Sequence, residues 1–100
     1  MIFVCGGAHS GTTLMATIVG ANEKTFLIPE ETNDFLPWSE ENRIKFFEKK
    51  NRGKILVEKT PRHLYHIKEI RESYPDSPVI VMFRNSYDVA YSLYKRNNNW

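Results

Sequence analysis

MIFVCGGAHSGTTLM, residues 1–15, contains an apolar run, a glycine-containing loop and the beginning of a helical pattern, in that order. Residues 2–5 are apolar without alternation, which is typical of a parallel strand buried on both faces. Residues 12–19 then place apolar side chains four positions apart, a spacing that favours a helix. The pairs are Leu14 with Ile18 and Met15 with Val19. The stretch therefore predicts a strand, a tight turn and a helix, the repeating unit of an α/β fold.

The turn between this strand and this helix has the glycine spacing of a phosphate-binding loop. Residues 6–13 read G-x-x-x-x-G-T-T, so Thr12 stands where the loop of a P-loop NTPase has its lysine. Glycines let the backbone approach a ligand closely, and successive N–H groups at the start of a helix attract an anion. Thr12 and Thr13 add hydroxyl donors. Because the glycines follow a strand and open a helix, an anion-binding loop is favoured over a tight turn without a ligand. The glycines are Gly6, Gly7 and Gly11.

The rest of the chain continues the alternation of strands and helices. We expect strands at 55–57 and 79–83, with a short extended piece at 26–28. A first further helix is expected from Ser39, as N-cap, to about Lys50. A second contains Leu64, Ile67 and Ile70 on one face and ends before Pro75, and a third runs from Ser86 to about Arg96. This order predicts a three-layer α/β fold, a parallel sheet flanked by helices. Since the sequence stops directly after a helical pattern, residues 1–100 are expected to be part of one larger domain, truncated at the C-terminus.

Polar residues follow each of the three main predicted strands. The strands are followed by GGAHSGTT, EKTPRH and RNSYD, and two of these segments carry cations. In open parallel sheets, ligands bind beyond the carboxyl ends of the strands. The three segments therefore indicate one shared anion site.

Four segments, in order, resemble the donor-binding part of sulfotransferases that use 3′-phosphoadenosine 5′-phosphosulfate (PAPS). AHSGTTLM resembles their 5′-phosphosulfate loop, and VIVMFRNSYDVAYSLYKR resembles their 3′-phosphate-binding segment. IPEETNDF and VEKTPRH lie between them and resemble segments of the tyrosylprotein and polysaccharide branches. The resemblance implies a P-loop NTPase-like sulfotransferase fold that transfers a sulfuryl group to an acceptor hydroxyl or amine. It also implies that no metal is required, so the phosphate-binding lysine of an NTPase loop is less needed here.

The resemblance also assigns roles to individual residues. Donor binding falls to the 5′ loop, namely Gly6, Gly7, His9, Ser10, Gly11, Thr12 and Thr13, and to Arg84 and Ser92 at the 3′-phosphate. Arginine suits that role because its fork of donors matches phosphate oxygens. Lys59 is expected to stabilise the leaving group. Glu31 is the expected general base, with Glu30 orienting the loop or the acceptor. Outside the glycine loop, each of these residues also has a plainer interpretation as a solvated or ion-paired surface side chain.

His9 departs from the family, which usually has lysine or arginine before Ser-Gly-Thr. A histidine has a pKa near 6.5 in model peptides, and a bound dianion favours its protonated form. We therefore expect His9 to donate to the phosphosulfate as one of the catalytic groups. His63 and His66 receive no role.

Bulk composition limits the classes of partner. With 14 Lys and Arg against 12 Asp and Glu, the net charge of +2 is too small to indicate nucleic-acid binding.

Cys5 is the only cysteine, so no internal disulfide is expected, and an apolar setting predicts an inert thiol. No apolar stretch approaches the roughly 18 residues of a transmembrane helix. The expected location is cytoplasmic as the sequence stands, or the Golgi lumen if the chain belongs to a longer anchored enzyme.

Two other functions stay open at this point. One is a P-loop nucleotide kinase or NTPase, which would need the loop lysine and a strand-terminal aspartate for Mg²⁺. The other is a non-catalytic paralogue that binds the nucleotide without transferring sulfate. The acceptor, whether protein tyrosine, glycan or small molecule, and the oligomeric state are not indicated by the sequence.

Overall fold

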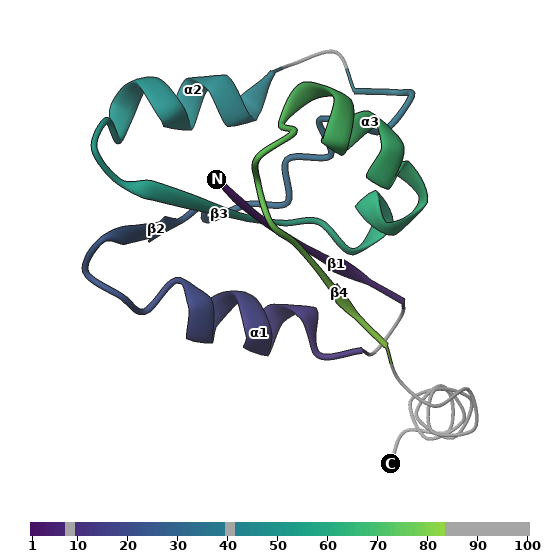
Figure 1. The fold of residues 1–100 in the computed structure, drawn as a ribbon, viewed down its shortest axis with the longest axis horizontal. Helices are drawn as coiled ribbons and strands as arrows, with labels where there is room; N and C mark the ends of the chain where they lie inside the picture. Colours follow the sequence, from purple (N-terminus) through teal and green to yellow (C-terminus); the bar gives the residue numbers. More distant parts are fainter. Residues whose placement is uncertain (8–9, 40–41, 84–100) are drawn as a thin grey trace.

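The computed structural model describes residues 1–7, 10–39 and 42–83. Within them, four strands alternate with helices (Figure 1). The strands are β1 (Ile2–Gly6), β2 (Thr25–Leu27), β3 (Ile55–Lys59) and β4 (Val79–Met82). The helices are α1 (Thr12–Val19), α2 (Arg43–Lys50), the 3₁₀ helix η1 (Pro61–His66) and α3 (Ile67–Ser73).

The four strands form one parallel sheet in the order β2-β3-β1-β4. The chain leaves β1 towards β2 at one edge and then returns through β3 to β4 at the other edge. Right-handed connections place helices on opposite faces when the direction of travel reverses. Accordingly α1 covers one face of the sheet, and α2 and α3 cover the other (Figure 1). The predicted three-layer α/β architecture is confirmed.

Each face of the sheet packs a separate apolar cluster. Between the sheet and α2 and α3, the buried residues are Phe3, Ile28, Ile44, Leu56 and Ile70. Between the sheet and α1 they are Val4, Ala16 and Val57. Phe3 and Val4 are neighbours on β1 and point to opposite faces because strand side chains alternate. Residues 2–5 are apolar because β1 contributes side chains to both clusters.

The expected strands are confirmed, whereas helix boundaries and faces differ in detail. Ser39 does not cap α2; that helix begins after Asn42, whose side chain accepts from the Lys45 N–H at 3.3 Å. Asp34 also accepts from the first two N–H groups of α2, at 3.1 and 2.8 Å, so the start of this helix is fixed by a carboxylate from another segment.

The apolar face of α1 also differs from the pattern. Leu14 and Ile18 are 67% and 60% exposed, and the small residues Thr12 and Ala16 face the sheet instead. Met15 and Val19, the other predicted pair, pack against the cluster as partly buried residues. The helix predicted from Ser86 lies outside the described residues.

Candidate functional site

The carboxyl ends of β1, β3 and β4 meet at one edge of the sheet. Val4 pairs with Lys59 and Gly6 pairs with Met82. The Thr60 N–H donates to the Val4 carbonyl at 3.2 Å, so the two chain segments stay together beyond the last residue of β3. The loop after β1 then turns towards α1, and the loop after β3 turns towards η1 on the other face. A crevice between oppositely directed loops is where open α/β sheets bind ligands.

The glycine loop depends on its glycines in two ways. At Gly6 the backbone of β4 is so close that an added Cβ would lie 2.4 Å from the Met82 carbonyl oxygen. Gly11, the N-cap of α1, has φ +85, a left-handed conformation that L side chains rarely adopt. The hydroxyl of Ser10 closes the loop by donating to the Gly7 carbonyl at 2.6 Å. Because the N-cap is a glycine, it has no side chain to accept from the first N–H groups of α1.

Candidate residues from three distant segments line one hollow of about 280 Å³. Thr13 comes from the glycine loop, Glu31 from the segment after β2, and Lys59 from the end of β3. The Lys59 ammonium lies 3.3 Å from the Glu31 carboxylate, with the side chains 20% and 46% exposed. An ion pair this exposed stabilises the fold by only about 0.2–1 kcal/mol. The ion pair therefore shows that the two side chains lie together, but it contributes little to the stability of the fold.

The two neighbouring carboxylates, Glu30 and Glu31, have different partners. Oε1 of Glu30 accepts from Nε and Nη2 of Arg43, at 3.1 and 2.8 Å, which joins this segment to α2. Glu31 is the carboxylate beside Lys59. Glu31 also lines a second hollow of about 280 Å³ with Asn33, Thr60, Pro61 and Arg62. It thus stands between two open spaces.

Five other predicted site residues lie in the loop between β1 and α1 or at its two ends, namely Gly6, Gly7, Ser10, Gly11 and Thr12. Ser10 and Thr12 are buried and Thr13 is exposed. His9, Arg84 and Ser92 lie outside the described residues. Among those described, no group of three or more His, Cys, Asp or Glu side chains is arranged to hold a metal ion.

Sequence reasoning missed a buried polar cluster beneath Glu31 and Lys59. Glu58 and His63 are 0% exposed, and Thr60 and Thr32 are 1% and 5% exposed. Glu58 Oε1 accepts from the Thr32 hydroxyl at 3.0 Å and from the Thr60 hydroxyl, while Oε2 lies 3.1 Å from His63 Nδ1. The available signal was a glutamate inside the apolar strand ILVEK, since buried charges need partners.

Burial and the Glu58 charge affect the ionisation of two neighbouring groups. Burial, with a smaller contribution from Glu58, raises the pKa of the Cys5 thiol. A raised pKa keeps the thiol protonated, which is consistent with the inert thiol expected from the sequence. Burial also raises the pKa of Asp34, although the N–H groups of Ile44 and Arg43 act in the opposite direction.

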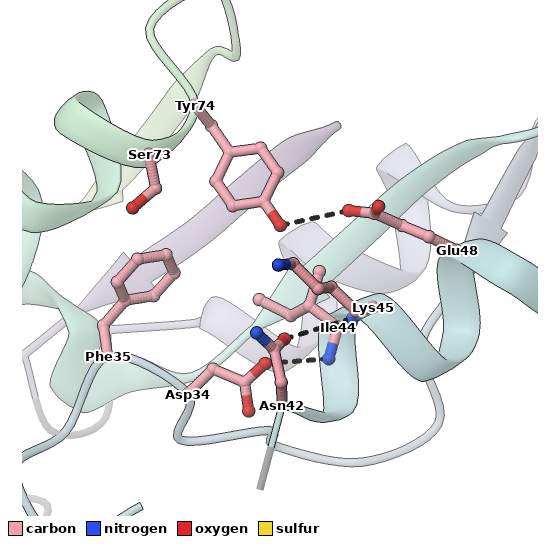
Figure 2. A pocket seen from close by; sticks show the side chains of 8 residues that line it. All are labelled: Asp34, Phe35, Asn42, Ile44, Lys45, Glu48, Ser73 and Tyr74. Atoms are coloured by element: carbon pink, nitrogen blue, oxygen red, sulfur yellow. Dashed lines mark hydrogen bonds between the residues drawn. The ribbon is translucent and has the colours of Figure 1, made fainter.

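A larger hollow of about 520 Å³ lies between α2 and α3 (Figure 2). The Tyr74 hydroxyl donates to Glu48 at 3.0 Å across it, and burial raises the Tyr74 pKa. None of the predicted site residues that the structure describes lines this hollow. Its lining residues are Asp34, Phe35, Asn42, Ile44, Lys45, Glu48, Ser73 and Tyr74.

Comparison with protein-family models matches residues 44–100 to the sulfotransferase family. The match covers more than half of the chain, and the chain therefore belongs to the sulfotransferase family. It includes VEKTPRH and the segment VIVMFRNSYDVAYSLYKR, whereas the glycine loop and Glu31 precede it. No match was found among curated proteins or among solved structures. In the part of the chain that the structure describes, no helix has the length and apolar character needed to cross a membrane.

Proposed function

We propose that this protein transfers a sulfuryl group from PAPS to an acceptor hydroxyl or amine. The observation that carries the proposal is the hollow in which Thr13, Glu31 and Lys59 meet, at the carboxyl edge of a parallel sheet in a sulfotransferase-family chain. It combines donors for an anion, a carboxylate that can accept a proton, and an ammonium that can stabilise a leaving group.

The donor's 5′-phosphosulfate would lie against the loop of residues 6–13. The N–H groups at the start of α1, with the helix dipole behind them, favour an anion there. His9 adds a donor whose charge depends on pH. Arg84 and Ser92 would hold the 3′-phosphate; Arg84 is two positions beyond Met82, the residue paired with Gly6.

In the proposed reaction the acceptor oxygen attacks sulfur while the bond from sulfur to the bridging oxygen breaks. Glu31 takes the acceptor's proton, which can contribute about 10²–10⁴-fold to the rate. Lys59 donates to the oxygen on which negative charge develops. An ammonium has three N–H donors, so the contact with Glu31 leaves two for the donor's oxygens. The products are a sulfated acceptor and 3′,5′-ADP.

Glu31 lines both hollows, so a base at this position can face the donor on one side and an acceptor on the other. We assign the hollow with Thr13 and Lys59 to the donor's reactive end. The hollow with Asn33, Thr60 and Arg62 is then the proposed approach for the acceptor.

Thermal shift with nucleotides tests the donor. Stabilisation by 3′,5′-ADP, and much less by 5′-AMP, is expected if a 3′-phosphate site is present, because a ligand stabilises only the state that it binds. Equal shifts would count against PAPS, and Mg²⁺-dependent binding of ATP would favour an NTPase. Binding of 3′,5′-ADP without sulfate transfer would indicate a non-catalytic paralogue. His9→Lys is expected to flatten the pH dependence of nucleotide binding.

A further inference from the structure

Glu58 is a fully buried carboxylate on the strand that carries Lys59. Burying a charged group is costly unless hydrogen bonds satisfy it. A Leu or Val would suit an apolar strand better if packing were all that this position required. The partners of Glu58 therefore indicate what the carboxylate does.

The carboxylate joins the end of β3 to the segment after β2. From that segment, Oε1 accepts the Thr32 hydroxyl at 3.0 Å and the Thr32 N–H at 3.4 Å. From its own strand end, it accepts the Thr60 hydroxyl. The Thr60 oxygen in turn lies 3.4 Å from the Asn33 N–H. Backbone and side chain of one segment are thus both tied to the other.

His63 extends this link to Phe35. The Phe35 N–H donates to His63 Nε2 at 3.2 Å, so the hydrogen-bond pattern assigns the ring proton to Nδ1. Nδ1–H then donates to Glu58 Oε2 at 3.1 Å. The ring acts as a neutral bridge between Glu58 and the backbone at residue 35.

The residues held by Glu58 are the immediate neighbours of the proposed reacting groups. Thr32 follows Glu31, and Lys59 lies between Glu58 and Thr60. We propose that Glu58 is a positioning residue that holds the segment of residues 31–35 against β3 and so sets Glu31 beside Lys59. The role in catalysis rests on the proposed function; the role in holding the segment does not.

Glu58→Gln tests this with a nearly isosteric change. If the new amide nitrogen replaces Oε1, it meets the Thr32 N–H, which is also a donor. If it replaces Oε2, it meets the N–H at His63 Nδ1, which is also a donor. If the imidazole proton were on Nε2 instead, that N–H would face the Phe35 N–H. One donor therefore loses its acceptor in either orientation, and buried unpaired donors destabilise the local structure.

The experiment compares Glu58→Gln with Ile70→Val, a conservative change at a buried core residue, in the purified full chain. Amide hydrogen exchange is measured at Thr32 and Phe35, with Tyr74 as the reference because its N–H donates to the Ile70 carbonyl at 2.7 Å. We expect faster exchange at Thr32 and Phe35 in Glu58→Gln alone, with Tyr74 unchanged. The kcat for sulfuryl transfer should fall about 10- to 100-fold, while the affinity for 3′,5′-ADP stays the same.

Exchange that rises equally at all three amides, or at none, overturns the positioning role. So does an unchanged kcat in Glu58→Gln despite faster local exchange, because Glu31 would then not depend on the link. If the wild-type protein transfers no sulfate, the proposed function fails. The exchange data alone then decide whether Glu58 holds the segment.

Discussion

The contact between Gly6 and β4 makes a sharp prediction about the glycine loop. In Gly6→Ala, the new Cβ would lie 2.4 Å from the Met82 carbonyl oxygen, 2.6 Å from Ser10 Oγ and 3.0 Å from Met82 Cβ. The Ser10 hydroxyl can rotate away, at the loss of its bond to Gly7. The Met82 carbonyl belongs to the strand paired with β1, so the strands themselves have to move. Overpacking of this kind typically costs about 1–3 kcal/mol, and we expect a loss of that size in the free energy of unfolding.

Gly7→Ala is the matched control, because an added Cβ there meets no atom of the described residues within 4 Å. Its free energy of unfolding should stay within about 0.5 kcal/mol of wild type, as for most surface changes. Urea titration followed by circular dichroism measures both variants. A Gly6→Ala protein as stable as wild type, or an equal loss in Gly7→Ala, would refute the close approach of β4 to the loop.

Three further changes test other parts of the site. Lys59→Ala should lower kcat about 10²- to 10³-fold in a sulfuryl-transfer assay, since one preorganised donor to the leaving group is lost; an unchanged kcat would remove Lys59 from the reaction. Asn33 has φ 57, so Asn33→Ala should cost about 1–2 kcal/mol on urea titration and Asn33→Gly less; equal losses would contradict the left-handed backbone. Because burial raises the Cys5 pKa, the thiol stays protonated above its usual pKa of about 8.5, and iodoacetamide should label it only after unfolding. Rapid labelling of the native protein at pH 8 would contradict its burial.

The strands were predictable because uninterrupted apolar runs are typical of the strands of a parallel sheet covered on both faces. Such runs are present at residues 2–5, 55–57 and 79–82. The helix face of α1 was harder to predict, because a four-residue spacing does not show which apolar stripe meets the sheet. Ala16 faces the sheet, and the longer Leu14 and Ile18 are exposed.

The site was predictable only in outline, because its links join residues far apart in sequence. Polar residues after three strands indicated a common edge, and Lys59 and Glu31 do meet there at 3.3 Å. Glu58 and His63 belong to one of these polar segments, EKTPRH, but the sequence did not show which residues they would contact. Their partners Thr32 and Phe35 are 26 and 28 positions away, and only the packing of the segment after β2 against β3 brings them together.

A crystal structure with bound 3′,5′-ADP tests the central claim most directly. The proposal predicts the 5′-phosphate within hydrogen-bond distance of the N–H groups of residues 10–13, near Lys59, with the Arg84 guanidinium on the 3′-phosphate. A nucleotide bound at another edge of the sheet, or Arg84 on the far side of the sheet from Gly11, would contradict it.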